Sequence, residues 1–266
     1  MKKRYDEILE AVVLTFLRNR EPIGSASLRS QLPFEISAAT IRYYFNKMVE
    51  RGELAQLHKS SGRIPTERTM KQFWRRHLGE LTLLCDALEE VEKLAEEERL
   101  FVLVKPVRAN RLRRIERVSD RYLILVFEED EYIIRYQAPL ESFLRDLIGY
   151  ELEEVKQIAR DVGMMSLFYK MRAKSEEEVH LCNPGEVIRI ASEQSYWGCR
   201  HLKEYLEGDA VETFGNGIHF DPLLPRGFMA LRTETTLDNR PVKLLCLGAI
   251  DHNFTKLFKM EVHDGR

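Results

Sequence analysis

The chain has 266 residues, of which 44% are hydrophobic and 32% are charged. This is the composition of an ordinary soluble protein with a substantial core, and it excludes a fibrous or low-complexity chain. The formal net charge is -2. Residues 1–80, however, hold 15 Lys and Arg against 9 Asp and Glu, a net +6, while the remainder carries a net -8. A basic head on an acidic body favours nucleic-acid contact through the head, although domains that merely differ in composition would give the same pattern.

The cysteines and the apolar runs indicate where the protein works. Four cysteines are too few for a disulfide scaffold, and a reducing cytosol fits them best. The longest apolar run, Tyr122–Phe127, is far below the roughly 20 residues of a membrane span. We therefore expect a cytoplasmic protein without a membrane segment.

The first 52 residues predict three helices. Apolar residues recur at helical spacing up to about Asn19, and a turn follows at Glu21–Gly24. Ser25 can cap a short second helix, and Pro33 ends it. Ser37 can cap a third helix from Ala38 to Arg51, which stops at Gly52.

The third helix carries the candidate DNA contacts. Ile41, Phe45 and Met48 form one stripe that should face the core. The outer face and the capped end present small, hydrogen-bonding and cationic groups, which suit base edges and phosphates. These candidates are Ser37, Ala39, Thr40, Arg42, Tyr43 and Asn46. Tyr43 has an alternative interpretation, in which its ring lies on its own domain.

A hairpin follows the third helix. Leu54–Leu57 predicts a strand, the next six residues a loop, and Ile64 the return strand. His58, Lys59, Ser60 and Arg63 in this loop are further candidates for DNA contact, with the cations neutralising phosphates. Gly62 should let the turn tighten and the backbone approach the duplex. Three helices and a hairpin predict a winged helix-turn-helix, in which this loop is the wing; a helical protein-interaction module is the alternative.

Several motifs in one order carry a family resemblance. They are Glu21-Pro22-Ile23-Gly24-Ser25, Ala39-Thr40-Ile41-Arg42, and His58 through Ser60 to Gly62-Arg63-Ile64-Pro65-Thr66. Together they resemble the heat-inducible transcription repressor family HrcA, strongly over residues 5–78 and loosely around Leu244–Met260.

This resemblance implies a bacterial repressor that binds an inverted-repeat operator called CIRCE, with its activity supported by the chaperonin GroEL. It implies a homodimer built from an N-terminal winged helix, a GAF-like body and an inserted dimerising segment, with no enzyme activity and no cofactor. Two features depart from the family. Tyr43 stands where a polar residue is usual, and the chain is shorter, which indicates a reduced or rearranged dimerising segment.

The acidic body predicts an α+β fold. Apolar residues at 81, 84, 88, 91 and 95 predict a linker helix, which either pairs two chains as a short coiled coil or packs on its own body. A basic cluster at residues 108–114, with Arg108, Arg111, Arg113 and Arg114, predicts a solvated helix face or a DNA-backbone contact, and residues 140–172 carry helical spacing. Strands are expected at 101–104, 122–127, 132–136, 187–191, 211–214, 228–233 and 244–250, and a helix at 193–206. We therefore expect a winged helix-turn-helix at 1–78, a linker helix at 79–99 and a GAF-like regulatory and dimerisation body at 100–266.

Two pairs of residues form a metal-like pattern. His180 and Cys182, with Cys199 and His201, would supply four zinc ligands, but their spacing is not that of a common finger. Buried thiols and surface histidines are the expected outcome, and no metal ligand or catalytic residue is predicted. Two rival functions remain open. One is a ligand-sensing regulator whose body binds a metabolite, and the other is an enzyme with a DNA-binding head.

Overall fold

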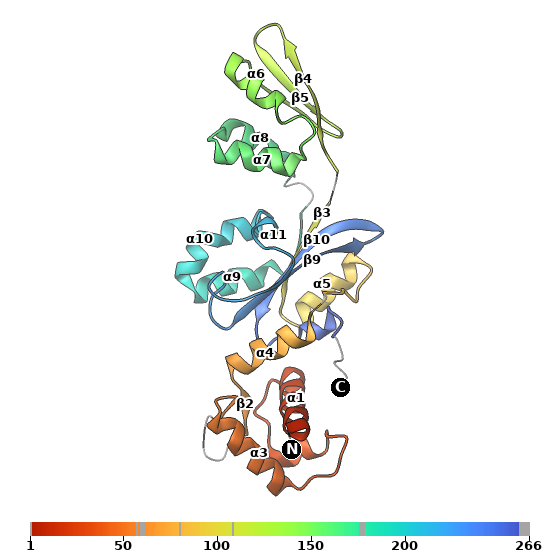
Figure 1. Cartoon of the computed structure of the whole chain (residues 1–266), viewed down its shortest axis with the longest axis vertical. Helices are drawn as coiled ribbons and strands as arrows, with labels where there is room; N and C mark the ends of the chain where they lie inside the picture. The colour runs from red at the N-terminus through yellow and green to blue at the C-terminus, as the bar shows by residue number, and fades with distance from the viewer. Residues whose placement is uncertain are drawn as a thin grey trace. The chain divides into compact units, whose positions relative to one another are not determined.

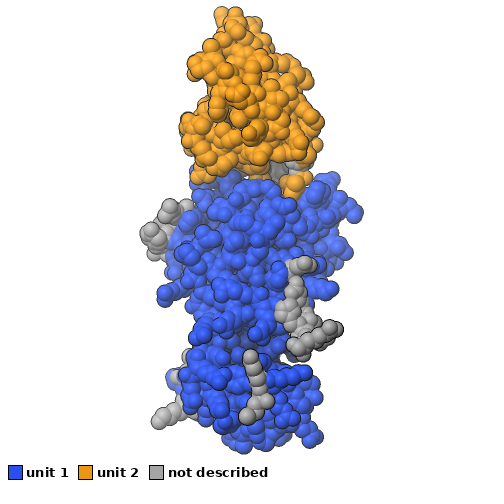
Figure 2. All heavy atoms as spheres, in the orientation of Figure 1, with its two compact units in different colours: residues 1–104, 181–266 blue, residues 105–180 orange. Residues whose placement is uncertain are grey.

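The computed structural model describes residues 2–56, 58, 62–79, 81–107, 109–175 and 179–260. The chain divides into two compact units (Figure 2), one formed by residues 1–104 and 181–266 and the other by residues 105–180. The second unit is therefore an insertion in the sequence of the first. Both units mix helices with strands, as the α+β prediction requires.

The N-terminal part of the first unit follows the predicted order (Figure 1). Its elements are α1 (Lys2–Asn19), α2 (Ser25–Arg29), α3 (Ala38–Glu50), β1 (Leu54–Ala55) and β2 (Ile64–Pro65). The three predicted helices are confirmed, and the last apolar position of the predicted strand, Leu57, lies outside the described residues. Ile8, Leu28 and Ile41 are fully buried together in the core of this part, which also buries Leu54.

A fourth helix, α4 (Glu67–His77), was not predicted. The Thr66 side chain caps it by accepting a hydrogen bond from the Thr69 amide. Trp74 on this helix is fully buried, and its indole Nε1 donates to the Ile250 carbonyl at 2.8 Å. The helix therefore joins the N-terminal part to the rest of its unit through an apolar core that includes Leu17.

A five-stranded sheet forms the centre of the rest of this unit. Its strand order is β7 (His180–Cys182), β3 (Phe101–Pro106), β10 (Arg240–Ala249), β9 (Phe228–Leu237) and β8 (Gly217–His219). Along β3, Val102 and Val104 belong to the core that includes helix α5 (Leu88–Glu97), whereas Phe101 contacts Tyr205 of α10 (Ser195–Leu206). Because side chains alternate along a strand, both faces of the sheet are covered. The short 3-10 helix η2 (Phe254–Lys256) contributes Phe254 to the same core.

Two predicted strands of this unit are helices. Residues 187–191 belong to α9 (Pro184–Glu193), and residues 211–214 fall largely in α11 (Ala210–Thr213). Their β-branched content suggested strands, but Pro184 begins α9 at a position where proline favours a helix. Val187 and Ile190, three residues apart, are both fully buried on one helix face.

The predicted linker helix is shorter than its apolar pattern. Helix α5 begins at Leu88, and the preceding segment is extended, with Leu83 bridged to Phe258. Val91 and Ala95 are fully buried in the core of their own unit. The coiled-coil interpretation is therefore wrong, and the alternative, packing on the protein's own body, is confirmed.

The inserted unit has a three-stranded antiparallel sheet with helices. The strands β4 (Leu112–Val118), β5 (Tyr122–Phe127) and β6 (Glu131–Arg135) lie in that order. The helices are α6 (Ala138–Arg145), α7 (Leu152–Asp161) and α8 (Met165–Ser175), so the helical spacing of residues 140–172 is confirmed. Leu123, Leu144 and Val155 are fully buried in this unit's own core.

The basic cluster of this unit does not form a helix face, because it lies in and beside strand β4. Arg111 pairs with Glu151 at 2.7 Å, and Arg113 pairs with Glu128. Arg108 lies outside the described residues. In the part of the chain that the structure describes, no helix is long and apolar enough to cross a membrane.

Candidate nucleic-acid interface

Helix α3 is fixed by its cap and by its inner face. The Ser37 hydroxyl accepts a hydrogen bond from the Thr40 amide at 3.1 Å and lies 2.8 Å from the Thr40 hydroxyl. Ile41, Phe45 and Met48 are buried, as their stripe predicted. The opposite face, with Ala39, Thr40, Arg42, Tyr43 and Asn46, is exposed. The structure therefore brings these predicted residues onto one surface, with Ser37 at the end of the same helix.

Tyr43 is held by its neighbours although 54% of it is exposed. The Lys47 ammonium nitrogen lies 4.6 Å from the centre of the Tyr43 ring, and the Tyr44 ring packs edge-on at 5.8 Å. Tyr44 in turn contacts Tyr5 of α1. Tyr43 therefore packs against residues of its own domain, as the alternative interpretation predicted. About half of the side chain nevertheless remains accessible to a partner.

The buttress beneath α3 was missed by sequence reasoning. The Tyr5 hydroxyl donates to the Glu53 carboxylate, and the Arg51 guanidinium carbon lies 4.8 Å from the centre of the Tyr5 ring. Burial, followed by the contact with Glu53, raises the pKa of Tyr5 to about 12. Because these partners lie 48 residues apart, local periodicity contained no signal for them. Lys47, by contrast, could have been found from its position one helical turn after Tyr43.

Arg63 connects the wing to α3 and to the turn after α1. Its Nη2 lies 3.5 Å from the Oδ1 of Asn46, which places a cation beside the exposed face of α3. Its backbone forms an isolated bridge with Ile23, in which each amide donates to the other's carbonyl at 2.8 and 2.9 Å. The wing and the turn at Glu21–Gly24 are therefore one structural feature.

Gly62 has a packing role that the sequence did not reveal. A Cβ at this position would lie 2.6 Å from the Ile23 carbonyl group and from the Pro22 carbonyl carbon. Only a residue without a side chain allows the two backbones to approach this closely. Of the other predicted wing residues, His58 is exposed, whereas Lys59 and Ser60 lie outside the described residues.

The combined surface has the chemistry of a duplex-binding face. It exposes the Arg42 guanidinium, the Asn46 amide, the Tyr43 ring and the N-terminal end of α3 at Thr40, while the half-buried Arg63 places its Nη2 beside Asn46. Cations and helix N-termini bind phosphates, while guanidinium and amide groups can bond base edges.

The metal-like residues do not form a comparable site. His180–Cys182 is a short strand and residues 199–201 are part of helix α10. Burial raises the pKa of the Cys182 thiol to about 12, which keeps it protonated and weakens it as a ligand. Among the described residues, His, Cys, Asp and Glu form no group of three that could hold a metal ion.

Comparison with known proteins identifies similar chains. Residues 74–263 match the family described as the HrcA C-terminal domain. The heat-inducible transcription repressor HrcA of Helicobacter pylori strain J99 is 27% identical over 254 residues, covering 96% of this chain and 92% of that protein. Its counterpart in strain ATCC 700392 / 26695 is 28% identical over 260 residues, with the same coverage. A crystal structure of a hypothetical protein aligns over 95% of this chain and 91% of its own, with a TM-score of 0.50 and 20% identity, and so shares the fold.

Proposed function

This chain belongs to the HrcA family, and we propose that it is a heat-inducible transcription repressor that binds duplex DNA through helix α3 and the wing. The observation that carries this proposal is the exposed face of α3, on which Arg42, Tyr43 and Asn46 lie beside Arg63 of the wing. The two Helicobacter pylori relatives that bear this name align with nearly the whole chain, including this face.

The N-terminal part would act as a winged helix-turn-helix. In that arrangement α3 enters the major groove, while the wing carries Arg63 to the adjacent backbone or minor groove. The rest of the first unit would be a GAF-like regulatory body, and the protein would act in the cytoplasm as a regulator rather than as an enzyme. Neither a metal nor a cofactor is required by this proposal.

The operator would be an inverted repeat of the CIRCE type bound by a homodimer. One head reads too few base pairs for specificity in a genome, and two-fold symmetry in the protein matches the repeat. The inserted unit offers a surface for pairing, because the sheet face away from its core exposes Val118, Tyr122 and Ile133 by 40%, 46% and 52%. A second copy of the same surface would cover these apolar side chains.

Sedimentation tests the dimer surface. We expect Ile133→Lys to shift the protein toward monomer, because a charge would have to be buried in the pairing surface. Ile188→Lys is the matched control, since Ile188 has a similar exposure of 49% but lies on α9 of the first unit. Equal dissociation by the two variants, or by neither, would argue against this surface.

One binding experiment tests the main proposal. Fluorescence anisotropy would compare a labelled CIRCE-type inverted repeat with a scrambled duplex, with and without the chaperonin GroEL. We expect tighter binding to the repeat, a steep fall in affinity with salt, and more active repressor in the presence of GroEL. Equal binding to both duplexes at all salt concentrations would contradict the proposal.

The ligand-sensing regulator remains the rival function. A thermal-shift screen of metabolites separates the two, because a ligand at free concentration L that binds only the folded body stabilises it by RT ln(1 + L/Kd) and so raises Tm once its concentration exceeds Kd. A metabolite that raised Tm and also changed operator affinity would favour the rival.

A further inference from the structure

Arg20 occupies a backbone conformation that normally calls for glycine. It directly follows α1, with φ of 55°, and its amide donates to the Phe16 carbonyl at 2.7 Å to close the helix. Glycine and asparagine dominate this left-handed position because other residues are strained there. Arg99 has the same φ of 55°, so this conformation alone assigns no role to an arginine side chain, and the contacts of Arg20 are what distinguish it.

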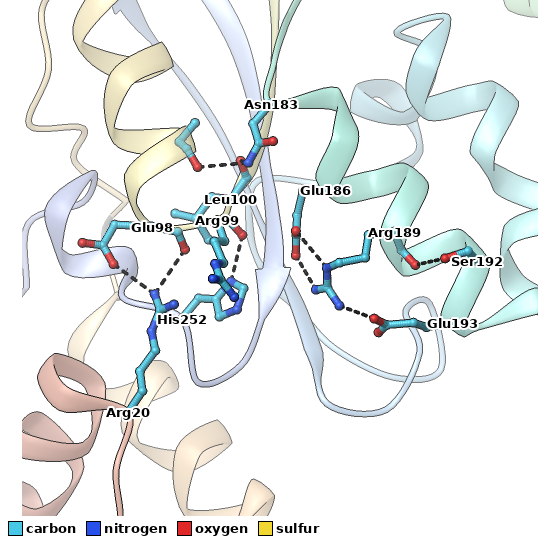
Figure 3. Close-up of polar contacts among 11 residues, drawn as sticks. Arg20, Glu98, Arg99, Leu100, Asn183, Glu186, Arg189, Ser192, Glu193 and His252 are labelled. Atoms are coloured by element: carbon cyan, nitrogen blue, oxygen red, sulfur yellow. Dashed lines mark hydrogen bonds and ion pairs between the residues drawn. The ribbon is translucent and has the colours of Figure 1, made fainter.

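The Arg20 side chain reaches the end of another helix. Its Nη2 lies 3.2 Å from the Glu98 carboxylate and 3.3 Å from the Glu98 carbonyl (Figure 3). Glu98 is the C-terminal cap of α5, where unpaired carbonyls favour a cation. The Arg20–Glu98 bridge therefore links the end of the first helix of the N-terminal part to the end of a helix in the body.

The receiving end of this bridge is firmly attached to the body. The His252 ring donates from Nδ1 to the Arg99 carbonyl at 2.8 Å. Asn183, the N-cap of α9, donates to the carbonyls of Ala95 and Leu100 at 3.2 and 3.1 Å. Figure 3 shows these contacts around the end of α5. Arg20 therefore binds the backbone of a helix end that several hydrogen bonds hold in place, in addition to the Glu98 side chain.

The other contacts between the N-terminal part and the body come from α4 and from the apolar face of α1. Trp74 of α4 packs edge-on against Phe254 at 5.5 Å and donates to the Ile250 carbonyl, and Lys71 of α4 pairs with Asp221. From α1 itself, Val13 and Leu17 contribute apolar contacts to the shared core. Apolar burial is non-directional and tolerates small rotations, whereas a guanidinium that donates to two acceptors favours one orientation.

We propose that Arg20 is a positioning residue that sets the orientation of the DNA-reading part on the body. This inference rests on the proposed function, because the orientation matters through the distance between two reading helices on an inverted repeat. Without the Arg20–Glu98 bridge, each head samples a wider range of orientations, and the dimer loses its preference for one spacing of half-sites.

Three variants isolate the side chain from the backbone. Arg20→Gly removes the bridge while relaxing the left-handed position, so a loss of positioning cannot be attributed to strain in the variant. Arg99→Gly is the matched control, because Arg99 has the same φ of 55° and its hydrogen bonds to described residues come from its backbone, which glycine retains: its carbonyl accepts from His252 and its amide donates to the Glu96 carbonyl. Arg20→Lys retains the charge with a single ammonium group and should restore part of the effect.

The first readout is binding to inverted repeats with different spacers. We expect Arg20→Gly to reduce the preference for the best spacer by about two- to fivefold, the range of a partly exposed ion pair, while leaving affinity for a single half-site unchanged. Arg99→Gly should behave as the parent, and Arg20→Lys should fall between them. A spacer preference unchanged in Arg20→Gly would overturn the proposal.

The second readout needs no DNA, so it tests the positioning role of Arg20 even if the proposed DNA-binding function is wrong. Spin labels placed at exposed Glu35 and Arg240 of the full-length chain report the distance between the N-terminal part and the body. Mixing with excess unlabelled protein removes signals between copies. We expect a narrow distance distribution in the parent and in Arg99→Gly, and a broader one in Arg20→Gly; equal widths in all three would overturn the positioning role.

Discussion

Replacing Gly62 by alanine tests whether the wing is built on the turn that follows α1. The added Cβ would lie 2.6 Å from backbone atoms of Ile23 and Pro22. Carbon atoms pack best at about 3.5 to 4.0 Å, so one of the two backbones must move by about 1 Å. No flexible side chain can absorb this movement, because the opposing atoms are carbonyl groups.

The cost follows from the hydrogen bonds that this movement breaks. Ile23 and Arg63 exchange two backbone hydrogen bonds of 2.8 and 2.9 Å. Each contributes about 0.5–1.5 kcal/mol net, so Gly62→Ala should lower the local free energy of opening by about 1–3 kcal/mol. Displacement of Arg63 from Asn46 should also weaken DNA binding, by about tenfold for each 1.4 kcal/mol lost.

Hydrogen exchange measured by mass spectrometry is the appropriate assay, because it reports on the segments that contain Ile23 and Arg63 separately from the body. Gly185→Ala is the control: it lies in the first turn of α9, where a Cβ approaches only the Asn183 side chain, at 3.9 Å. Protection of both segments within about 0.5 kcal/mol of the parent would refute the reasoning.

Three further outcomes are expected. Arg42→Ala should weaken operator binding by about 1–3 kcal/mol and reduce the discrimination against a scrambled duplex, measured by anisotropy. Arg63→Ala should weaken binding to all sequences and lower the salt slope by about one, measured in a salt titration. Burial, followed by the nearby Arg20, lowers the pKa of His252, so its neutral form is favoured in the folded state. The unfolded chain therefore takes up a proton first as pH falls below about 6.5, and Tm should drop between pH 7 and 5 less steeply in His252→Asn than in the parent; equal slopes would exclude His252 as the cause.

Local sequence patterns predicted helix α3, whereas contacts between residues far apart in the sequence were not predicted. The cap at Ser37 and the buried stripe of Ile41 and Phe45 lie within one helix, so spacing alone located them. The bridge between Ile23 and Arg63 joins residues 40 positions apart, and periodicity contains no information about it. The same limit explains why the inserted unit was not delimited: β3 and β7, which flank it in sequence, are neighbours in one sheet.

The errors in the body have a common physical cause. Residues 187–191 and 211–214 are rich in apolar and β-branched side chains, which a buried helix and a buried strand both accept. The heptad-like pattern before Val91 failed for a related reason, because Leu83 is apolar in order to pack as an extended segment beside Phe258. In these segments the apolar residues were correctly predicted to be buried, but their spacing did not determine whether the backbone forms a helix or a strand.

The motifs that suggested the family stabilise the fold as well as forming the proposed interface. A variant in one of these motifs therefore tests DNA binding cleanly only if it leaves the local packing unchanged. Gly62 is required by the approach to Ile23, and the Thr66 hydroxyl accepts from the first turn of α4 and donates to the Gly52 carbonyl at 2.9 Å. Arg63 contacts Asn46, so its removal changes local packing together with charge. Arg42 differs from these: its side chain is exposed, and within the described ranges it forms no ion pair. A loss of operator binding in Arg42→Ala with unchanged Tm would therefore report on recognition alone, and an unchanged affinity would count directly against α3 as the reading helix.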